Sequence, residues 1–311
     1  MLDPVILFFA LGFLAGVLKS DLRIPRSFYE TLSIYLLLSI GIKGGIELYK
    51  SHITEVVSPA AFALITGILL TVIAYAALRY LFRFSIKDAC GIAAHYGSVN
   101  TVTFAVVLNY CKSNHIPYEE YMTVLLVLME VPGIATAILL YKFQERESGT
   151  NWIKIVCEVF FGKSILLVIG GLFIGYITAS MGDKQLNFFF FDLFKGFLSI
   201  FMLEMGVVAS EKFGELKVYG TKILAFAVLM PLLAACIGIA SAQLMGLGTG
   251  GHIIFATLCA SASYIAAPAA IKMAVPGANV SLSLTAALGI TLPFNLIIGI
   301  PFYHLLILKL L

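Results

Sequence analysis

The chain has 311 residues, of which 60% are hydrophobic and 12% are charged, and its formal net charge is +3. A soluble domain usually carries about twice that share of charge, so the composition excludes an ordinary soluble protein and indicates an integral membrane protein. The basic residues lie in short loops and form no patch, which argues against a nucleic-acid partner.

Ten apolar stretches approach the roughly 20 residues that a helix needs to cross a bilayer. Before the midpoint they are residues 4–18, 27–44, 57–81, 89–110 and 121–143, and after it 163–181, 188–209, 221–244, 252–272 and 281–308. A charged loop at 144–151 and an interfacial lead-in helix at 152–162 are expected between the two sets. We therefore predict an all-α membrane protein with ten transmembrane helices.

The two halves of the chain resemble each other in register. Gly12 and Gly16 in the first span match Gly171 and Gly175 in the sixth, and Pro132 in the fifth span matches Pro293 in the tenth. Because each half has an odd number of spans, the second must insert upside down. The predicted domains are thus a five-helix repeat at 1–143, a cytoplasmic linker at 144–162 and an inverted five-helix repeat at 163–311, the usual frame of a secondary transporter.

The orientation follows from the basic residues. Fourteen of the 20 Lys and Arg residues lie in loops after odd-numbered spans or in the midpoint linker. Since such residues concentrate on the cytoplasmic side, these loops are expected in the cytoplasm and both termini outside.

Two spans in matching positions of the halves carry polar residues where a lipid-facing helix would carry Leu or Val. The fourth span has Gly97, Ser98, Asn100, Thr101 and Thr103, and the ninth has Ser261, Ala262, Ser263 and Tyr264. Such interrupted spans are the best sequence indication of a transporter's binding site, and breaks would cost least at Gly97 and Pro268. The alternative, close helix packing through small residues, is the better explanation of one isolated cluster but a weaker one for a repeat-related pair.

A break exposes amide groups at a half-helix N-terminus, which favour an anion, and carbonyls that bind a cation. Neutral oxygens in number suit Na⁺, for which Ser98, Asn100, Ser261 and Ser263 are the expected ligands.

Glu130 and Glu204 lie within the fifth and seventh spans. Intramembrane carboxylates usually face a cavity and serve an ion path, so we predict ion-path or gating roles. Alternatively, they are protonated and bond a neighbouring helix.

With these features, the chain resembles the sodium-dependent bicarbonate transporter family known from cyanobacterial carbon uptake. The resemblance is carried, in order, by residues 40–45, 97–103, 116–119, 129–132, 198–200, 261–263 and 275–279 with Pro293. It implies broken fourth and ninth helices that cross at the membrane midplane, a core and a gate domain, and Na⁺-coupled symport of bicarbonate by alternating access. It also implies a homotrimer in the bacterial cytoplasmic membrane, in contact with lipids and regulated by a cytosolic PII-like protein.

The chain departs from the family pattern within the two interrupted spans and at Glu204, which stands where the family has valine. Asn100 and Val102 stand where the family has serine, Thr101 where it has glycine, and Tyr264 where it has an acidic residue. Our hypothesis is that Glu204 replaces some of the lost charge.

Other function classes fit less well. The same fold could carry another small anion or a monocarboxylate, with H⁺ coupling through Glu130 or Glu204. A channel would need a continuous polar path, and the short loops argue against a sensor. An enzyme is not expected, because the sequence has no nucleophile–base pair or metal-ligand spacing, and the five cysteines are scattered (Cys90, Cys111, Cys157, Cys236 and Cys259).

Overall fold

The computed structural model describes residues 4–22, 24–50, 53–145, 163–181 and 188–311, which form helices and connecting turns without any strand. The predicted all-α class is therefore confirmed. The lead-in helix predicted at 152–162 and most of the charged loop before it lie outside the described residues.

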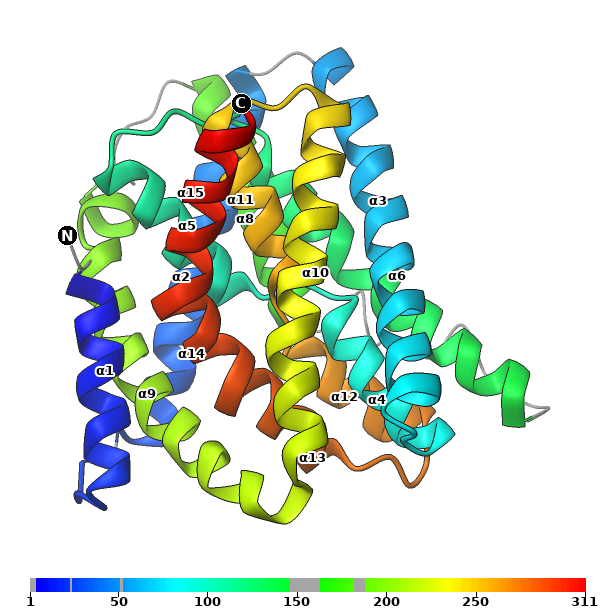
Figure 1. Ribbon diagram of the computed structural model, residues 1–311. Helices are drawn as coiled ribbons and strands as arrows, with labels where there is room; N and C mark the ends of the chain where they lie inside the picture. Colours follow the sequence, from blue (N-terminus) through cyan, green and yellow to red (C-terminus); the bar gives the residue numbers. More distant parts are fainter. Residues whose placement is uncertain (1–3, 23, 51–52, 146–162, 182–187) are drawn as a thin grey trace.

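The helices follow the predicted spans closely (Figure 1). The first half contains α1 (Pro4–Val17), α2 (Arg26–Lys50), α3 (Ile53–Ala76) with the π-helical turn η1 (Ala77–Leu81), α4 (Ile86–Tyr96), α5 (Thr101–Ser113) and α6 (Met122–Glu145). The second half contains α8 (Lys163–Met181), η2 (Phe188–Asp192), α9 (Phe194–Tyr219), α10 (Thr221–Met245), α11 (Thr249–Ala260) and α12 (Ala266–Ala274). The chain ends in a continuous helical stretch made of α13 (Val280–Leu284), η3 (Thr285–Thr291), α14 (Leu292–Phe294), η4 (Asn295–Gly299) and α15 (Ile300–Leu310).

Within the described part of the chain, seven helical stretches are long and apolar enough to cross a membrane. They are Arg26–Lys50, Glu55–Leu81, Ile86–Ser113, Met122–Gln144, Phe188–Gly214, Thr221–Met245 and Val280–Leu310. Three shorter apolar helices, Pro4–Val17, Ile165–Ala179 and Thr249–Ala260, fall at the remaining predicted spans. That all ten predicted spans traverse the membrane stays a prediction.

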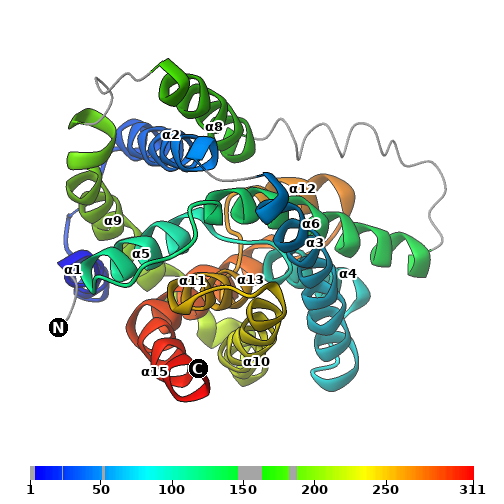
Figure 2. The ribbon, with the colours of Figure 1, turned by 90° about the horizontal axis from the view of Figure 1, so that it is seen from above.

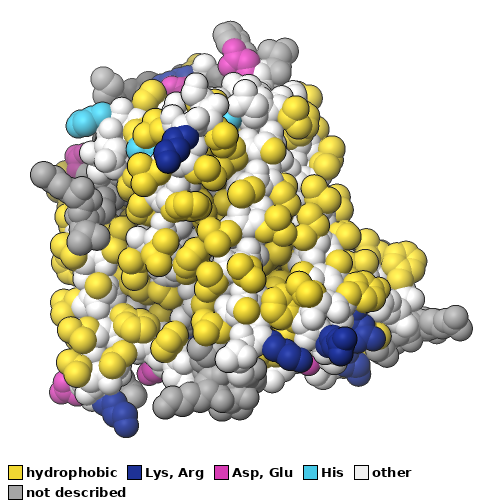
Figure 3. Space-filling model, in the orientation of Figure 1, with side chains coloured by type: hydrophobic (Ala, Val, Ile, Leu, Met, Phe, Trp, Pro, Cys, Tyr) yellow, Lys and Arg dark blue, Asp and Glu magenta, His cyan; other side chains and the backbone are white. Residues whose placement is uncertain are grey.

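The outer surface is apolar. Hydrophobic side chains cover most of the face in Figure 3, and Lys and Arg gather near its lower edge. Large apolar side chains such as Leu229, Phe302 and Leu305 are exposed on the surface of the bundle. A soluble monomer rarely exposes contiguous apolar surface of this kind, so the face is suited to lipid.

Glycines bring two pairs of helices into backbone contact. A Cβ on Gly12 of α1 would collide with the carbonyl oxygen of Leu203 in α9, and a Cβ on Gly206 of α9 would collide with the carbonyl oxygen of Phe9. The pair α2 and α8 is joined in the same way, because Gly41 and Gly171 approach each other directly. Since lipid gives helices no hydrophobic reason to associate, such close approach is a main source of their attraction.

The bundle has two parts when seen from above (Figure 2). Helices α1, α2, α8 and α9 pack together on one side, and α3, α4, α6, α10 and α11 pack together on the other. Between them runs α5, and the interrupted spans meet inside the second part.

Candidate functional site

Both predicted interruptions are present. Helix α4 ends at Tyr96 and α5 begins at Thr101, so residues 97–100 are not helical. Helix α11 ends at Ala260 and α12 begins at Ala266, which leaves residues 261–265 non-helical. We call these two segments together the crossing.

The second break was predicted at the wrong place. Pro268 lies inside α12, in its first turn, and the helix is instead interrupted between Ala260 and Ala266. In the first turn of a helix the backbone N–H groups have no intrahelical partner, so the missing N–H of a proline costs little there. Pro268 therefore permits a helix start and does not mark the break.

Hydrogen bonds join the two segments directly. The backbone N–H of Asn100 donates to Ser261 Oγ over 3.0 Å, and the Asn100 side-chain amide donates to the carbonyl oxygen of Ala262 over 3.2 Å. The N–H of Ser263 donates to the carbonyl oxygen of His95 over 2.8 Å. Because unpaired backbone groups are very costly in lipid, each break satisfies groups that the other leaves exposed.

Asn100 also starts the next helix. Its Oδ1 accepts the N–H groups of Val102, at 2.8 Å, and Thr103, at 3.2 Å, which makes it the N-cap of α5. On the other segment, Ser263 Oγ accepts the N–H of Ala267 near the start of α12. Two helix N-termini, each with a partial positive charge, therefore begin at the crossing.

The first break is packed tightly against α3 and α6. Ser98 Oγ donates to the carbonyl oxygen of Glu130 over 2.9 Å. A Cβ on Gly97 would collide with the side chain of Thr71, and a Cβ on Gly133 with the carbonyl oxygen of Gly97. Only glycine fits at Gly97 and Gly133 while these helices keep their positions.

The second break is supported by the last span, which the sequence analysis did not include in the site. Asn295 Nδ2 donates to the carbonyl oxygen of Ala260 over 2.7 Å, and Tyr303 OH holds Asn295 Oδ1 at 2.8 Å. Thr291 shares a 2.6 Å hydrogen bond with Tyr96 at the end of α4. The available signal was the polar pair Thr291 and Asn295 on either side of Pro293 in an otherwise apolar span.

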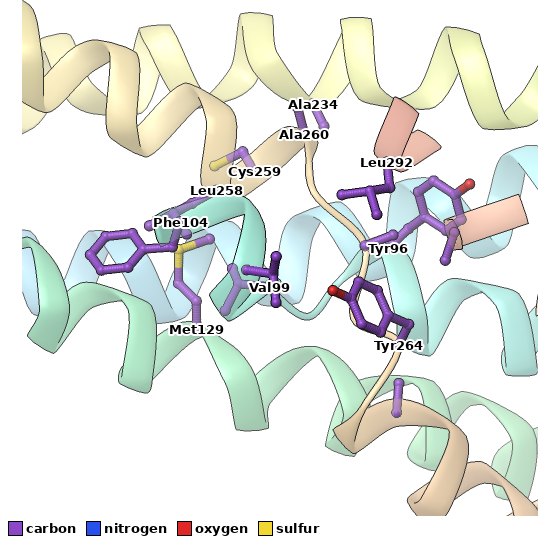
Figure 4. Packing of buried hydrophobic residues seen from close by; sticks show 14 of the residues in the cluster. Tyr96, Val99, Phe104, Met129, Ala234, Leu258, Cys259, Ala260, Tyr264 and Leu292 are labelled. Atoms are coloured by element: carbon purple, nitrogen blue, oxygen red, sulfur yellow. The ribbon is translucent and has the colours of Figure 1, made fainter. Parts of the chain in front are cut away.

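The predicted site residues at the crossing are buried. The exposed fraction is 8% for Tyr264 and lower still for the other polar members, Ser98, Asn100, Thr101, Thr103, Ser261 and Ser263. Figure 4 shows the two non-helical segments passing each other among apolar side chains that include Val99, Phe104 and Leu258. The crossing is thus a set of neutral oxygens and amides within an apolar surround.

The two carboxylates occupy different surroundings. Glu130 is 3% exposed, and its backbone carbonyl holds Ser98. Glu204 is half-buried, and its carboxylate accepts the N–H of Ile24, in the loop between α1 and α2, over 3.2 Å. Its neighbour Met205 receives the hydroxyl of Tyr264 at its sulfur over 3.6 Å, so Glu204 lies one residue from a direct contact with the crossing.

His95 is fully buried next to the first break. Its carbonyl oxygen accepts the bond from Ser263, but neither ring nitrogen has a hydrogen-bond partner among the described residues. Its location beside Gly97 makes it part of the crossing.

Comparison with known families agrees with this geometry. The family model of the Na⁺-dependent bicarbonate transporter superfamily matches residues 4–308. The chain belongs to this superfamily. The search of curated proteins returns no match.

Membership in the Na⁺-dependent bicarbonate transporter superfamily makes the chain an integral membrane transporter and gives no support to an enzyme. Within this superfamily, the departures noted above gain a structural account. Asn100, at a serine position, caps α5 with its Oδ1 and reaches the carbonyl oxygen of Ala262 on the other segment with its Nδ2. Tyr264, at the acidic position, directs its hydroxyl to Met205.

The predicted Na⁺ ligands carry oxygens that already take part in hydrogen bonds. Asn100 Oδ1 accepts two backbone N–H groups, and Ser261 Oγ accepts from Asn100 while it donates to the carbonyl oxygen of Leu258. Ser98 Oγ uses its hydrogen on Glu130 and keeps its lone pairs for an ion. The assignment of these residues to Na⁺ stays a prediction.

An apolar constriction leads from the crossing towards one end of the bundle. A pocket of only about 10 Å³, the room of about one water molecule, lies beside Thr101, Val102 and Ile265. Leu36, Leu37 and Ile40 of α2 close its other side. The crossing is thereby separated from the larger cavity beyond Ile40.

Proposed function

We propose that the chain is a Na⁺-coupled symporter that carries bicarbonate across the bacterial cytoplasmic membrane by alternating access. The observation that carries the proposal is the pairing of two interrupted spans through Asn100, Ser261 and Ala262. In transporters built from inverted repeats, substrate and coupling ion bind at such breaks near the midplane.

The helix contacts support an inverted repeat of two five-span halves, 1–143 and 163–311. Gly12 of the first span packs on the seventh, and Gly171 of the sixth packs on the second. The breaks follow the same relation, since Asn100 and Ser261 occupy matching places in the two halves and bond to each other. A pseudo-two-fold axis through that bond accounts for both facts. It supports membrane spanning by all ten segments with both termini on the same side, and the distribution of Lys and Arg favours the outside.

The roles of the site residues follow from their chemistry. The N-termini of α5 and α12 favour the anion, with Thr101, Thr103 and Tyr264 beside it. Oxygens of Ser98, Asn100, Ser261 and Ser263, together with backbone carbonyls such as those of Gly97 and Ala262, are the proposed Na⁺ ligands. Glu130 and Glu204 serve the ion path or the gate.

Uptake of labelled bicarbonate into proteoliposomes tests the proposal. We expect saturable uptake that requires an inward Na⁺ gradient, whereas a channel would give flux that does not saturate with substrate. Asn100→Leu should abolish uptake in protein that still folds. Asn114→Leu, a matched change at the exposed far end of α5, should not. Normal uptake by Asn100→Leu contradicts the site assignment.

A second candidate keeps the fold but couples transport of another small anion or a monocarboxylate to H⁺. The observation that favours it is the burial of Glu130 together with the absence of an acidic side chain at Tyr264. Uptake driven by a pH gradient without Na⁺, and lost in Glu130→Gln, supports this candidate. Uptake that needs Na⁺ and persists in Glu130→Gln excludes it.

Assembly as a homotrimer and binding of a PII-like regulator complete the proposal, on the resemblance alone. The mass of the purified protein in detergent tests the first: three copies are expected, and a monomer contradicts it. Co-purification with a PII-like protein tests the second.

A further inference from the structure

A second, larger cavity among the described residues lies outside the crossing, on the other side of the apolar constriction. It has a volume of about 930 Å³ and is walled by the C-terminal parts of α2, α5 and α8 together with η2 and the start of α9. We call this cavity the vestibule.

The vestibule is basic. Four lysines line it, against the two carboxylates of Glu47 and Asp192; the lysines are Lys43, Lys50, Lys112 and Lys195. A cavity with low-dielectric walls concentrates the field of such charges and raises the local concentration of counter-ions. The excess of positive charge therefore favours small anions inside it.

The lysines differ in how they are held. Lys43 donates to Tyr118 OH over 2.7 Å and lies 3.4 Å from the Glu47 carboxylate, and Lys195 reaches Ser113 Oγ at 3.5 Å. Lys50, at the end of α2, and Lys112, near the end of α5, are both exposed. Because the charge of Lys50 interacts with the Glu47 carboxylate, the charge of Lys112 is the one most available to an entering anion.

Helix α5 connects the vestibule with the crossing. Asn109, Lys112 and Ser113 near its C-terminal end line the vestibule, while Thr101 at its N-terminal end lines the constriction. The 13 residues of α5 span about 20 Å. Ile40 of α2 borders both spaces, so the vestibule ends where the constriction begins.

We propose that the vestibule is an anion-collecting site for the transported substrate, in which Lys112 supplies the principal attracting charge. The identity of the collected anion rests on the proposed function. The electrostatic preference of the vestibule for anions over cations is independent of that function. Collection raises the anion concentration at the constriction and changes nothing at the crossing itself.

Transport kinetics give the first test. Because the charge lies at the entrance, we expect Lys112→Gln to raise the KM for bicarbonate about two- to fivefold with unchanged kcat, and to weaken the dependence of KM on ionic strength. Lys112→Arg should restore both. Lys309→Gln, at the end of α15 and away from the vestibule, is the matched control and should change neither. An unchanged KM in Lys112→Gln, or a fall in kcat alone, overturns the proposal.

Thiol labelling gives a second test that does not depend on the transported substrate. Ala179 lines the vestibule and is half-buried, so Ala179→Cys can serve as a reporter in a variant without Cys236 and Cys157. We compare the reaction rates of an anionic and a cationic methanethiosulfonate. The ratio of the anionic to the cationic rate should be higher at this cysteine than at a free thiol in solution. Adding Lys112→Gln should reduce that preference.

If the ratio of anionic to cationic labelling rates is the same at Ala179→Cys and at the free thiol, the vestibule proposal is overturned. If wild-type protein takes up no bicarbonate while the anionic reagent keeps its preference, the proposed function fails and the vestibule stands. The two failures are thus distinguishable.

Discussion

Asn100 makes a quantitative prediction possible because its side chain has two separable tasks. Its Oδ1 caps α5, and its Nδ2 joins the two broken spans through the Ala262 carbonyl oxygen. Loss of an N-cap costs about 1 kcal/mol, and a side-chain hydrogen bond between membrane helices averages about 0.6 kcal/mol. We therefore expect Asn100→Ala to lower the free energy of unfolding by about 1.6 kcal/mol.

Asn100→Ser separates the two tasks. A serine keeps an acceptor for the N–H groups of Val102 and Thr103 and adds no charge to the apolar surround, but it lacks the amide that reaches Ala262. It should therefore be more stable than Asn100→Ala and less stable than the wild type.

The measurement is unfolding in mixed detergent micelles followed by circular dichroism, with Asn114→Ala as the control. The Asn114 side chain is exposed and donates to the carbonyl oxygen of Tyr110, a neighbour on the same helix, so its replacement should change the free energy of unfolding by no more than about 0.5 kcal/mol. An Asn100→Ala protein as stable as the wild type, or a serine variant less stable than the alanine variant, refutes this account of the crossing.

Three further predictions concern other elements. Gly206→Leu should sharply reduce the yield of folded protein, because the new side chain would collide with the backbone of α1. Gly196→Leu, on the same helix but with open space around its Cα, is the control and should fold normally. Size-exclusion chromatography compares the yields of the two variants. Tyr118→Phe removes the hydroxyl that Lys43 bonds but keeps the ring beneath its ammonium, so it should cost no more than about 1.5 kcal/mol of stability, whereas Tyr118→Ala should cost more. Glu204→Gln should raise the Na⁺ concentration for half-maximal uptake if Glu204 replaces the missing acidic charge, and exposed Glu211→Gln on the same helix should leave it unchanged; an unchanged Na⁺ dependence in Glu204→Gln eliminates that hypothesis.

The sequence was sufficient for the helices and for the first break, because both depend on local patterns. Apolar stretches of sufficient length predicted the helical positions, and Gly97 among polar residues predicted where α4 ends. Asn100 is a recognisable N-cap, since its short side chain can accept N–H groups two and three residues later.

The sequence was insufficient wherever a contact joins distant parts of the chain. The second break lies before Pro268 because residues 261–265 pair with the first break, and that pairing cannot be seen in a local pattern. Asn295 supports Ala260 across 35 positions, and the vestibule gathers lysines from α2, α5 and α9. Each of these needs the fold before its partners are known.

The cross-bonding of the two breaks has a consequence for biosynthesis. When the ribosome has completed α6, the N–H and side-chain amide of Asn100 and the carbonyl oxygen of His95 are already in place, but Ser261, Ala262 and Ser263 have not been made. The tie from Asp88 at the start of α4 to the N–H of Asn279 is missing as well. Until more than a hundred further residues have been added, these groups of the first half lack the partners that they have in the finished fold. In the meantime, water or the insertion machinery must supply the hydrogen-bond partners of those groups. The first half therefore cannot complete its fold before the second half has been synthesised.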